Sequence, residues 1–195
     1  MDYHTEQYYK NNKFAFFEST VNADVSDLYD HFFMHIPHGG TILDLGCGSG
    51  RDTKSFLDMG YSVEAIDGSA ELCKLASEYT EISVQCMDFC DLCVEEKYDG
   101  IWACASLLHV SLRDLPGIFQ KISSALKPNG ILYASFKFGD FDGERDGRYF
   151  TDMTDERFAA VLNKVDGLII IDKWYSEDVR PDRDVRWFNV ILRKG

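Results

Sequence analysis

Hydrophobic and polar positions along the chain form two alternating patterns. Short apolar runs of strand length recur, at residues 41–45, 62–67, 82–89, 101–105 and 130–138. Between them lie stretches whose apolar residues repeat at helical spacing. Strands that alternate with helices through short loops predict a Rossmann-like α/β fold, a parallel sheet with helices on both faces. Runs at 168–174 and 186–192 predict two more strands.

The segment before the first strand is predicted to be helical. Its clearest part ends at Pro37 and the pair Gly39-Gly40, and Asp24 is a candidate N-cap. One apolar face is formed by Val25, Leu28, Tyr29, Phe32 and Ile36. Residues 2–20, rich in Tyr, Phe and Asn, have a less regular helical pattern. Residues 1–38 therefore form a helical cap, which either only packs on the sheet or covers a ligand site.

Three further helices have recognisable starts. Ser69 is a candidate N-cap, and so is Thr154. A third helix starts at Ser111 or Asp114, with Pro116 in its first turn. The helix after Ser69 is expected to bury Leu72, Leu75, Ala76 and Tyr79.

The stretch from Thr41 to Gly60 combines a strand, a glycine turn and a helix start. Asp44 lies near the end of the strand, and Gly46, Gly48 and Gly50 follow at alternate positions. Glycine allows a ligand to approach the backbone closely, and a helix N-terminus offers unpaired N–H groups. A phosphate loop is excluded because no Gly-Lys-Ser/Thr run follows. The dinucleotide fingerprint is excluded because its third glycine would fall on Arg51 or Thr53.

Acidic residues end the next two predicted strands. Asp67 lies 21 residues after Gly46 and precedes Gly68 and Ser69. A carboxylate there can accept hydrogen bonds from both hydroxyls of a ribose, and the alternative is a turn or capping residue. Asp88 stands between Met87 and Phe89 at the end of the third strand.

Together these motifs resemble the class I S-adenosylmethionine (SAM) dependent methyltransferases, with Asp44 and its glycines as motif I. The resemblance implies SAM as cofactor and S-adenosylhomocysteine as product. It implies that Asp44 binds the methionine ammonium group directly or through water, and that Asp88 binds the adenine amino group between Met87 and Phe89. The implied cofactor-binding residues are Asp44, Gly46, Cys47, Gly48, Gly50, Asp67, Gly68, Ser69, Met87, Asp88, Phe89, Ala105 and Ser106.

The resemblance covers residues 41–138, and the compact length with its Gly-Ser-Gly-Arg-Asp turn is similar to the tellurite-resistance type. It implies a single domain over residues 1–195 with a seven-stranded sheet whose last strand runs antiparallel between its neighbours. Residues 139–195 would then form a substrate-side loop, a helix and the closing strands. No Asn/Asp-Pro-Pro-Tyr motif is present, which speaks against amino-group methylation of adenine or glutamine.

In such an enzyme the methyl group moves in line to a nucleophile, and a base is needed only where that nucleophile keeps its proton. His109 is the candidate base, because imidazole titrates near neutrality. The alternative is a structural histidine. Tyr8, Tyr9 and Tyr149 are further candidates, and Tyr9, Arg148 and Tyr149 are candidate substrate contacts. Arg180, Arg183 and Arg186 either bind an anionic substrate or pair with nearby Asp residues.

The amino-acid composition limits which binding partners are expected for this chain. The net charge of −13 speaks against nucleic acid and anionic membranes, so a small-molecule acceptor is expected. No stretch of 18 apolar residues and no signal pattern occurs, so a cytoplasmic protein with reduced cysteines is expected. Cys86, Cys90 and Cys93 lack the spacing of a zinc site, and the acidic loop 139–148 lacks the glycine of a calcium loop. No metal is therefore expected.

The leading hypothesis is thus a small-molecule methyltransferase. A second hypothesis is a SAM- or nucleotide-binding module without catalysis. A third is an NAD-dependent oxidoreductase, against which the failed fingerprint and the missing Tyr-x-x-x-Lys pattern both speak. The sequence names neither the acceptor nor the oligomeric state.

Overall fold

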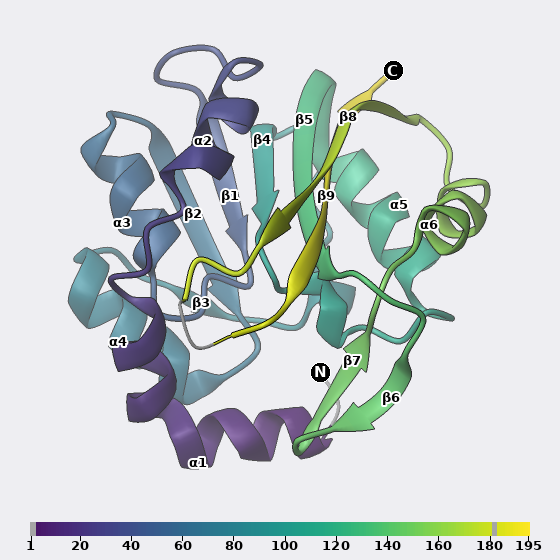
Figure 1. Ribbon diagram of the computed structural model, residues 1–195. Helices are drawn as coiled ribbons and strands as arrows, with labels where there is room; N and C mark the ends of the chain where they lie inside the picture. The colour runs from purple at the N-terminus through teal and green to yellow at the C-terminus, as the bar shows by residue number, and fades with distance from the viewer. Residues whose placement is uncertain (1–2, 181–182) are drawn as a thin grey trace.

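A computed structural model describes residues 3–180 and 183–195, and its centre is a seven-stranded sheet (Figure 1). The strand order is β3-β2-β1-β4-β5-β9-β8. Neighbours from β3 to β5 pair in parallel, and β9 pairs antiparallel with both β5 and β8. The strands are β1 (Thr41–Leu45), β2 (Ser62–Asp67), β3 (Gln85–Cys86), β4 (Tyr98–Ala103), β5 (Leu126–Lys137), β8 (Leu168–Glu177) and β9 (Arg186–Lys194). The predicted Rossmann-like sheet with an antiparallel last strand is confirmed.

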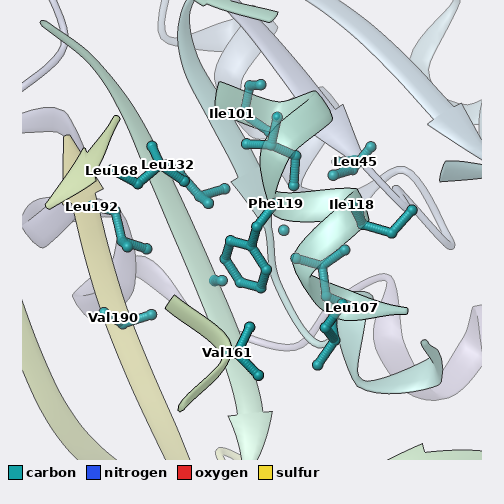
Figure 2. Packing of buried hydrophobic residues seen from close by; sticks show 14 of the residues in the cluster. Leu45, Ile101, Leu107, Ile118, Phe119, Leu132, Val161, Leu168, Val190 and Leu192 are labelled. Atoms are coloured by element: carbon teal, nitrogen blue, oxygen red, sulfur yellow. The ribbon is translucent and has the colours of Figure 1, made fainter. Parts of the chain in front are cut away.

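Helices cover both faces of this sheet (Figure 1). They are α1 (Tyr3–Thr20), α2 (Ser26–Phe33), α3 (Arg51–Asp58), α4 (Ala70–Thr80), α5 (Leu115–Ala125) and α6 (Asp155–Leu162). Successive side chains of a strand point to opposite faces. Ile101 of β4 therefore belongs to the core under α5 and α6, and its neighbour Trp102 to the core under α2 and α3. Figure 2 shows Phe119 of α5 at the centre of the first core, near Val161 of α6.

Helix starts agree with the sequence except at α2. Ser69 caps α4 by accepting from Leu72 N, Thr154 caps α6, and Asp114 precedes α5. The N-cap of α2 is Val25 rather than Asp24, whose carboxylate accepts instead from Ser26 N. The expected burial of Tyr79 is wrong, because this ring is 38% exposed. The next residue, Thr80, is buried in α4 instead.

Several sequence-based boundaries also differ from the structure, and one expected loop is wrong. The expected strand 82–89 is reduced to the two residues of β3, since only Gln85 and Cys86 pair with β2. The strand expected at 101–105 is β4, which starts earlier and ends at Ala103. The polar segment expected as a solvated loop is a β-hairpin of β6 (Asp142–Arg145) and β7 (Arg148–Thr151).

Helix α1 lies across the edge of the sheet to which β1 and β4 point (Figure 1). It contacts α4 at one side and β7 at the other. Asp2, where the helical pattern was expected to begin, lies outside the described residues. Within the described part of the chain, no helix is both long and apolar enough to span a bilayer.

Candidate active site

A cavity of about 1030 Å³ lies at the carboxyl ends of the parallel strands, under α1 and β7. Open parallel sheets bind ligands at this edge. All the predicted cofactor residues line it except Asp44, Gly50 and Ser69. His109, Tyr9, Arg148 and Tyr149 line it as well.

The turn between β1 and α3, residues 46–50, is called the glycine loop below. Its glycines are needed for two different reasons. Gly46, Gly48 and Gly50 all have positive φ, of 83°, 57° and 80°. A Cβ on Gly46 would lie 2.5 Å from Ser106 Cβ, so the end of β4 packs directly on this residue. A Cβ on Gly50 would lie 2.8 Å from Thr80 Cγ2. Gly50 therefore serves the packing of α3 on α4, whereas Gly46 and Gly48 line the cavity.

Asp44 lies behind the loop instead of on the cavity wall. It is 2% exposed, and its Oδ2 accepts a 2.6 Å hydrogen bond from Thr53 Oγ1 of α3. Burial raises the pKa of its carboxyl to about 8, and the charge of Asp52 adds to the shift. The structure thus ties Asp44 to the first turn of α3, and Asp44 is not among the residues that line the cavity.

Asp67 joins the glycine loop to α4. Its Oδ2 accepts from Gly48 N at 2.9 Å, and its Oδ1 accepts from Ser69 N at 2.8 Å. Burial raises the pKa of this carboxyl, although the backbone hydrogen bonds oppose the shift. The turn role is therefore present in the structure, and the carboxylate also lines the cavity. Ser69 itself is fully buried as the cap of α4.

Asp88 lies at the next strand end, between Met87 and Phe89, and all three line the cavity. Its Oδ1 accepts from Cys90 N at 3.0 Å, which caps the short 3-10 helix Phe89–Asp91. No group of His, Cys, Asp or Glu suited to a metal occurs in the ranges 3–180 and 183–195. Cys86, Cys90 and Cys93 are exposed free thiols.

The end of β4 has a left-handed backbone at Ala105, whose φ is 51°. For a residue with a Cβ this conformation is costly, and such strain gathers at functional sites. It is held by two hydrogen bonds, from Ala105 N to Ser135 Oγ and from Ser106 Oγ to Leu45 O. Ala105 and Ser106 are thereby fixed on the cavity wall beside the glycine loop.

The ion pair between Arg51 and Asp52 also lies on this wall, although no role was predicted for either residue from the sequence. The guanidinium donates to Asp52 through Nε at 2.6 Å and through Nη2 at 2.9 Å. Asp52 also accepts from Tyr29 OH and from Trp102 Nε1. Burial alone would raise the pKa of Asp52, but Arg51 and these hydrogen bonds hold that pKa below its ordinary value. The sequence alone does not tell whether two adjacent, oppositely charged residues at the start of a helix lie on the wall of a cavity.

His109 lines the cavity from the 3-10 turn Leu107–His109. Its Nδ1 lies 2.7 Å from the carbonyl oxygen of Tyr149, and its Nε2 lies 2.8 Å from Tyr9 OH. A carbonyl can only accept, so Nδ1 carries a proton. In the neutral ring Nε2 then accepts from Tyr9, and burial raises the pKa of that phenol to about 12.

In the β6–β7 hairpin, the side chains of Arg148 and Tyr149 point to different surroundings. The guanidinium carbon of Arg148 lies 4.1 Å from the ring centroid of Tyr8, and its side chain lines the cavity. The Tyr149 hydroxyl points to Asp142, to which it donates at 3.0 Å. The backbone of Tyr149 binds both His109 and Thr5, so this residue ties α1 to the site through its main chain.

Comparison with known proteins agrees with this geometry. Residues 42–130 match the family model described as "Methyltransferase domain". This matched segment, somewhat less than half of the chain, is similar to a methyltransferase domain. A curated relative, the ubiquinone biosynthesis O-methyltransferase of Xanthomonas axonopodis pv. citri (strain 306), is 32% identical over 106 residues. That match covers 51% of this chain but only 44% of the relative, so the chain spans less than half of that protein's length.

Solved structures share the fold of this chain. A SAM-dependent methyltransferase from Methanosarcina mazei superimposes with a TM-score of 0.75 at 19% identity, over 85% of this chain and 97% of that one. The 1,6-didemethyltoxoflavin-N1-methyltransferase of Burkholderia thailandensis, solved with S-adenosylhomocysteine, gives 0.75 at 21% identity, over 96% and 84%. The match to a methyltransferase domain and the S-adenosylhomocysteine in the second structure support SAM as the cofactor that the motifs predicted.

Proposed function

We propose that this protein transfers a methyl group from SAM to a small-molecule acceptor. One observation carries the proposal: the glycine loop, Asp67 and Asp88 share a single cavity with His109. A cofactor bound along the strand ends would therefore reach the side of the cavity where a base is available. The net charge of −13 favours a small molecule over nucleic acid as acceptor.

The residues present fit the cofactor. Gly46 and Gly48 leave room for close approach to the backbone, and Asp67 would hold the ribose hydroxyls. Asp88 would bind the adenine amino group while Met87 and Phe89 cover the ring. Arg51, on the same wall as the loop, would take the methionine carboxylate. When bound, SAM supplies a methyl group activated by its sulfonium centre.

The chain's own residues would align the acceptor and handle its proton. Tyr9 and Phe16 of α1 line the cavity and would exclude water from it. An acceptor O–H would donate to the Tyr9 oxygen as the Tyr9 proton passes to His109 Nε2. The carbonyl of Tyr149 would stabilise the imidazolium that results, because it accepts the Nδ1 proton.

A hydroxyl is the acceptor group that this arrangement serves best. An alcohol or phenol keeps its proton at neutral pH, so it gains from the base. The curated relative from Xanthomonas is an O-methyltransferase by name, which supports the same choice. The second candidate, a SAM-binding module without catalysis, would not need the Tyr9–His109 pair.

Calorimetric titration with SAM, S-adenosylhomocysteine and NAD tests the proposal. We expect micromolar binding of the first two and none of NAD. Asp67→Ala should weaken SAM binding about 100-fold, since two charge-assisted hydrogen bonds worth roughly 1.5 kcal/mol each are lost. Asp91→Ala, which removes an exposed carboxylate nearby, is the matched control. Binding of NAD alone would refute the proposal, and SAM binding with no transfer to any acceptor would favour the binding module.

A further inference from the structure

Three cationic side chains surround the ring of Phe150, which is 2% exposed. Lys137 Nζ lies 4.0 Å from the ring centroid, and the guanidinium carbons of Arg145 and Arg148 each lie 4.9 Å from it. Such a concentration of positive charge is unexpected in a chain with 33 acidic and 20 basic residues. It therefore calls for a compensating negative charge.

Among the described residues, Arg145 alone of the three has such a partner. It donates two hydrogen bonds to Asp152, at 3.1 Å and 3.0 Å. Lys137 and Arg148 form no ion pair with any residue in the described part of the chain. In addition, Nε of Arg148 is buried and lacks a hydrogen-bond partner within residues 3–180 and 183–195. Buried donors are normally satisfied, so a ligand is the natural partner.

Burial and the neighbouring positive charges both lower the pKa of Lys137. Burial lowers the pKa of its amine to about 8, and Arg145 contributes in the same direction. Arg148 and Arg183 also lower this pKa, whereas Asp152 raises it. An anion bound at this place would reverse the shift and stabilise the charged amine.

Lys137 and Arg148 both line the cavity on the side of His109. The ring of Phe150 lies 5.0 Å from that of His109, centroid to centroid. Lys137 ends β5, whereas Asp67 ends β2 and Asp88 follows β3, at the other side of the sheet. An anion bound by these two cations therefore lies where the acceptor would lie, away from the residues suited to adenosine.

We propose that the methyl acceptor carries an anionic group, a carboxylate or a phosphate, which Arg148 and Lys137 bind beside Phe150. Arg148 contacts the rings of Tyr8 and Phe150, and a guanidinium that stacks on rings keeps its in-plane N–H groups for a forked bond to an oxyanion. Phe150 and Trp187 also line this side of the cavity, so the body of the acceptor would be apolar or aromatic. The inference rests on the proposed methyltransferase function and specifies its substrate class.

The test uses 4-hydroxybenzoate, 4-hydroxybenzamide and phenyl phosphate as probes, with the full chain saturated with S-adenosylhomocysteine. Ligand-observed NMR measures the affinity of each probe, and calorimetry measures that of S-adenosylhomocysteine. The variants are Lys137→Met and Arg148→Met, with Lys137→Arg and Arg148→Lys as variants that keep the charge. Lys164→Met, at an exposed position beyond α6, is the control for the change in net charge.

We expect the carboxylate or the phosphate to bind at least tenfold more tightly than the amide, and the preferred probe identifies the anion. Lys137→Met and Arg148→Met should each weaken that binding about tenfold or more, whereas Lys164→Met and the affinity for S-adenosylhomocysteine should not change. Weaker S-adenosylhomocysteine binding in both Met variants would assign the cations to the cofactor's carboxylate and overturn the proposal. Equal binding of acid and amide, or binding of no anionic probe, would also overturn it. Failure of the wild-type chain to bind S-adenosylhomocysteine would instead refute the methyltransferase function.

Discussion

The Tyr9 hydroxyl lies 2.8 Å from His109 Nε2, although 100 positions separate the two residues in the chain. This hydrogen bond connects α1 to the part of the cavity wall that His109 forms. Within the described residues, α1 buries only Thr5 and Tyr9. A helix held by so few buried side chains has a low cost of local opening. The pair thus links the candidate base to a helix whose residues line the cavity.

Tyr9→Phe should loosen α1 while the sheet stays intact. Loss of one hydrogen bond costs about 1 kcal/mol, so amide exchange in residues 3–20 should become roughly fivefold faster. Hydrogen exchange with mass spectrometry measures the effect. Tyr3→Phe is the matched control, because Tyr3 is 68% exposed on the same helix. Unchanged protection in Tyr9→Phe would mean that the hydrogen bond does not hold α1 in place.

His109→Gln should lower kcat by about 10²–10⁴-fold with an acceptor that needs deprotonation, which is the usual effect of removing a general base. S-adenosylhomocysteine binding should stay the same, and the pH dependence of kcat should lose its acidic limb. Assays with radiolabelled SAM measure the rates. His35→Gln, at an exposed position, provides the control. A loss below tenfold with an unchanged pH profile would make His109 a structural residue.

Asp52→Asn should destabilise the fold by about 3 kcal/mol. The substitution leaves the Arg51 cation without its counter-charge, and one-sided loss of a buried pair typically costs roughly 3–5 kcal/mol. Urea denaturation measures the change. Asp58→Asn, in the same helix, removes an exposed partner of Lys54 and should have a much smaller effect on stability. Equal effects of the two substitutions would show that burial of the Arg51–Asp52 pair has no energetic consequence.

The parts of the fold that depend on local pattern were predictable from the sequence. The limits of β1 and β2 agree with the structure, and Ser69 and Thr154 cap their helices as expected. These features follow from apolar runs and from side chains that bond to a backbone group a few residues away. Cavity-lining Gly46 and Asp67 were predictable for the same reason, because strand ends and their order fix where such residues meet.

The hairpin β6–β7 was not predictable, since distant contacts hold it. Thr151 Oγ1 donates to Val110 O, and Tyr149 N donates to Thr5 Oγ1, 144 residues away. The packing of Asp44 against Thr53 was missed because no pattern tells whether a strand-end carboxylate faces a helix or a cavity. Lys137 was missed because it reads as an ordinary strand-end residue until the hairpin brings Arg145 and Arg148 beside it.

Stability should fall with rising pH because of Asp44. Its pKa in the folded chain is about 8, above the ordinary value of 3.8, so the folded state binds more protons between these values. The contribution of Asp44 is thus full at low pH and is lost as the pH rises towards 8. Relative to Asp44→Asn, the wild type should lose about 1 kcal/mol per pH unit between pH 5 and 8, as measured by urea denaturation. Parallel pH curves for the two proteins would contradict a raised pKa.

Two glycine-to-alanine substitutions should change the stability of the protein in opposite directions. Gly50→Ala places a Cβ 2.8 Å from Thr80 Cγ2 on a backbone with φ of 80°, so it should cost about 2 kcal/mol or more. Gly117 lies in α5, where an added Cβ would meet nothing within 4 Å, so Gly117→Ala should stabilise by roughly 0.4–1 kcal/mol. Thermal and urea denaturation measure both. Because Gly50 faces α4 and not the cavity, S-adenosylhomocysteine affinity in the folded Gly50→Ala protein should change far less than its stability. A large loss of affinity at full stability would instead place Gly50 in the binding surface.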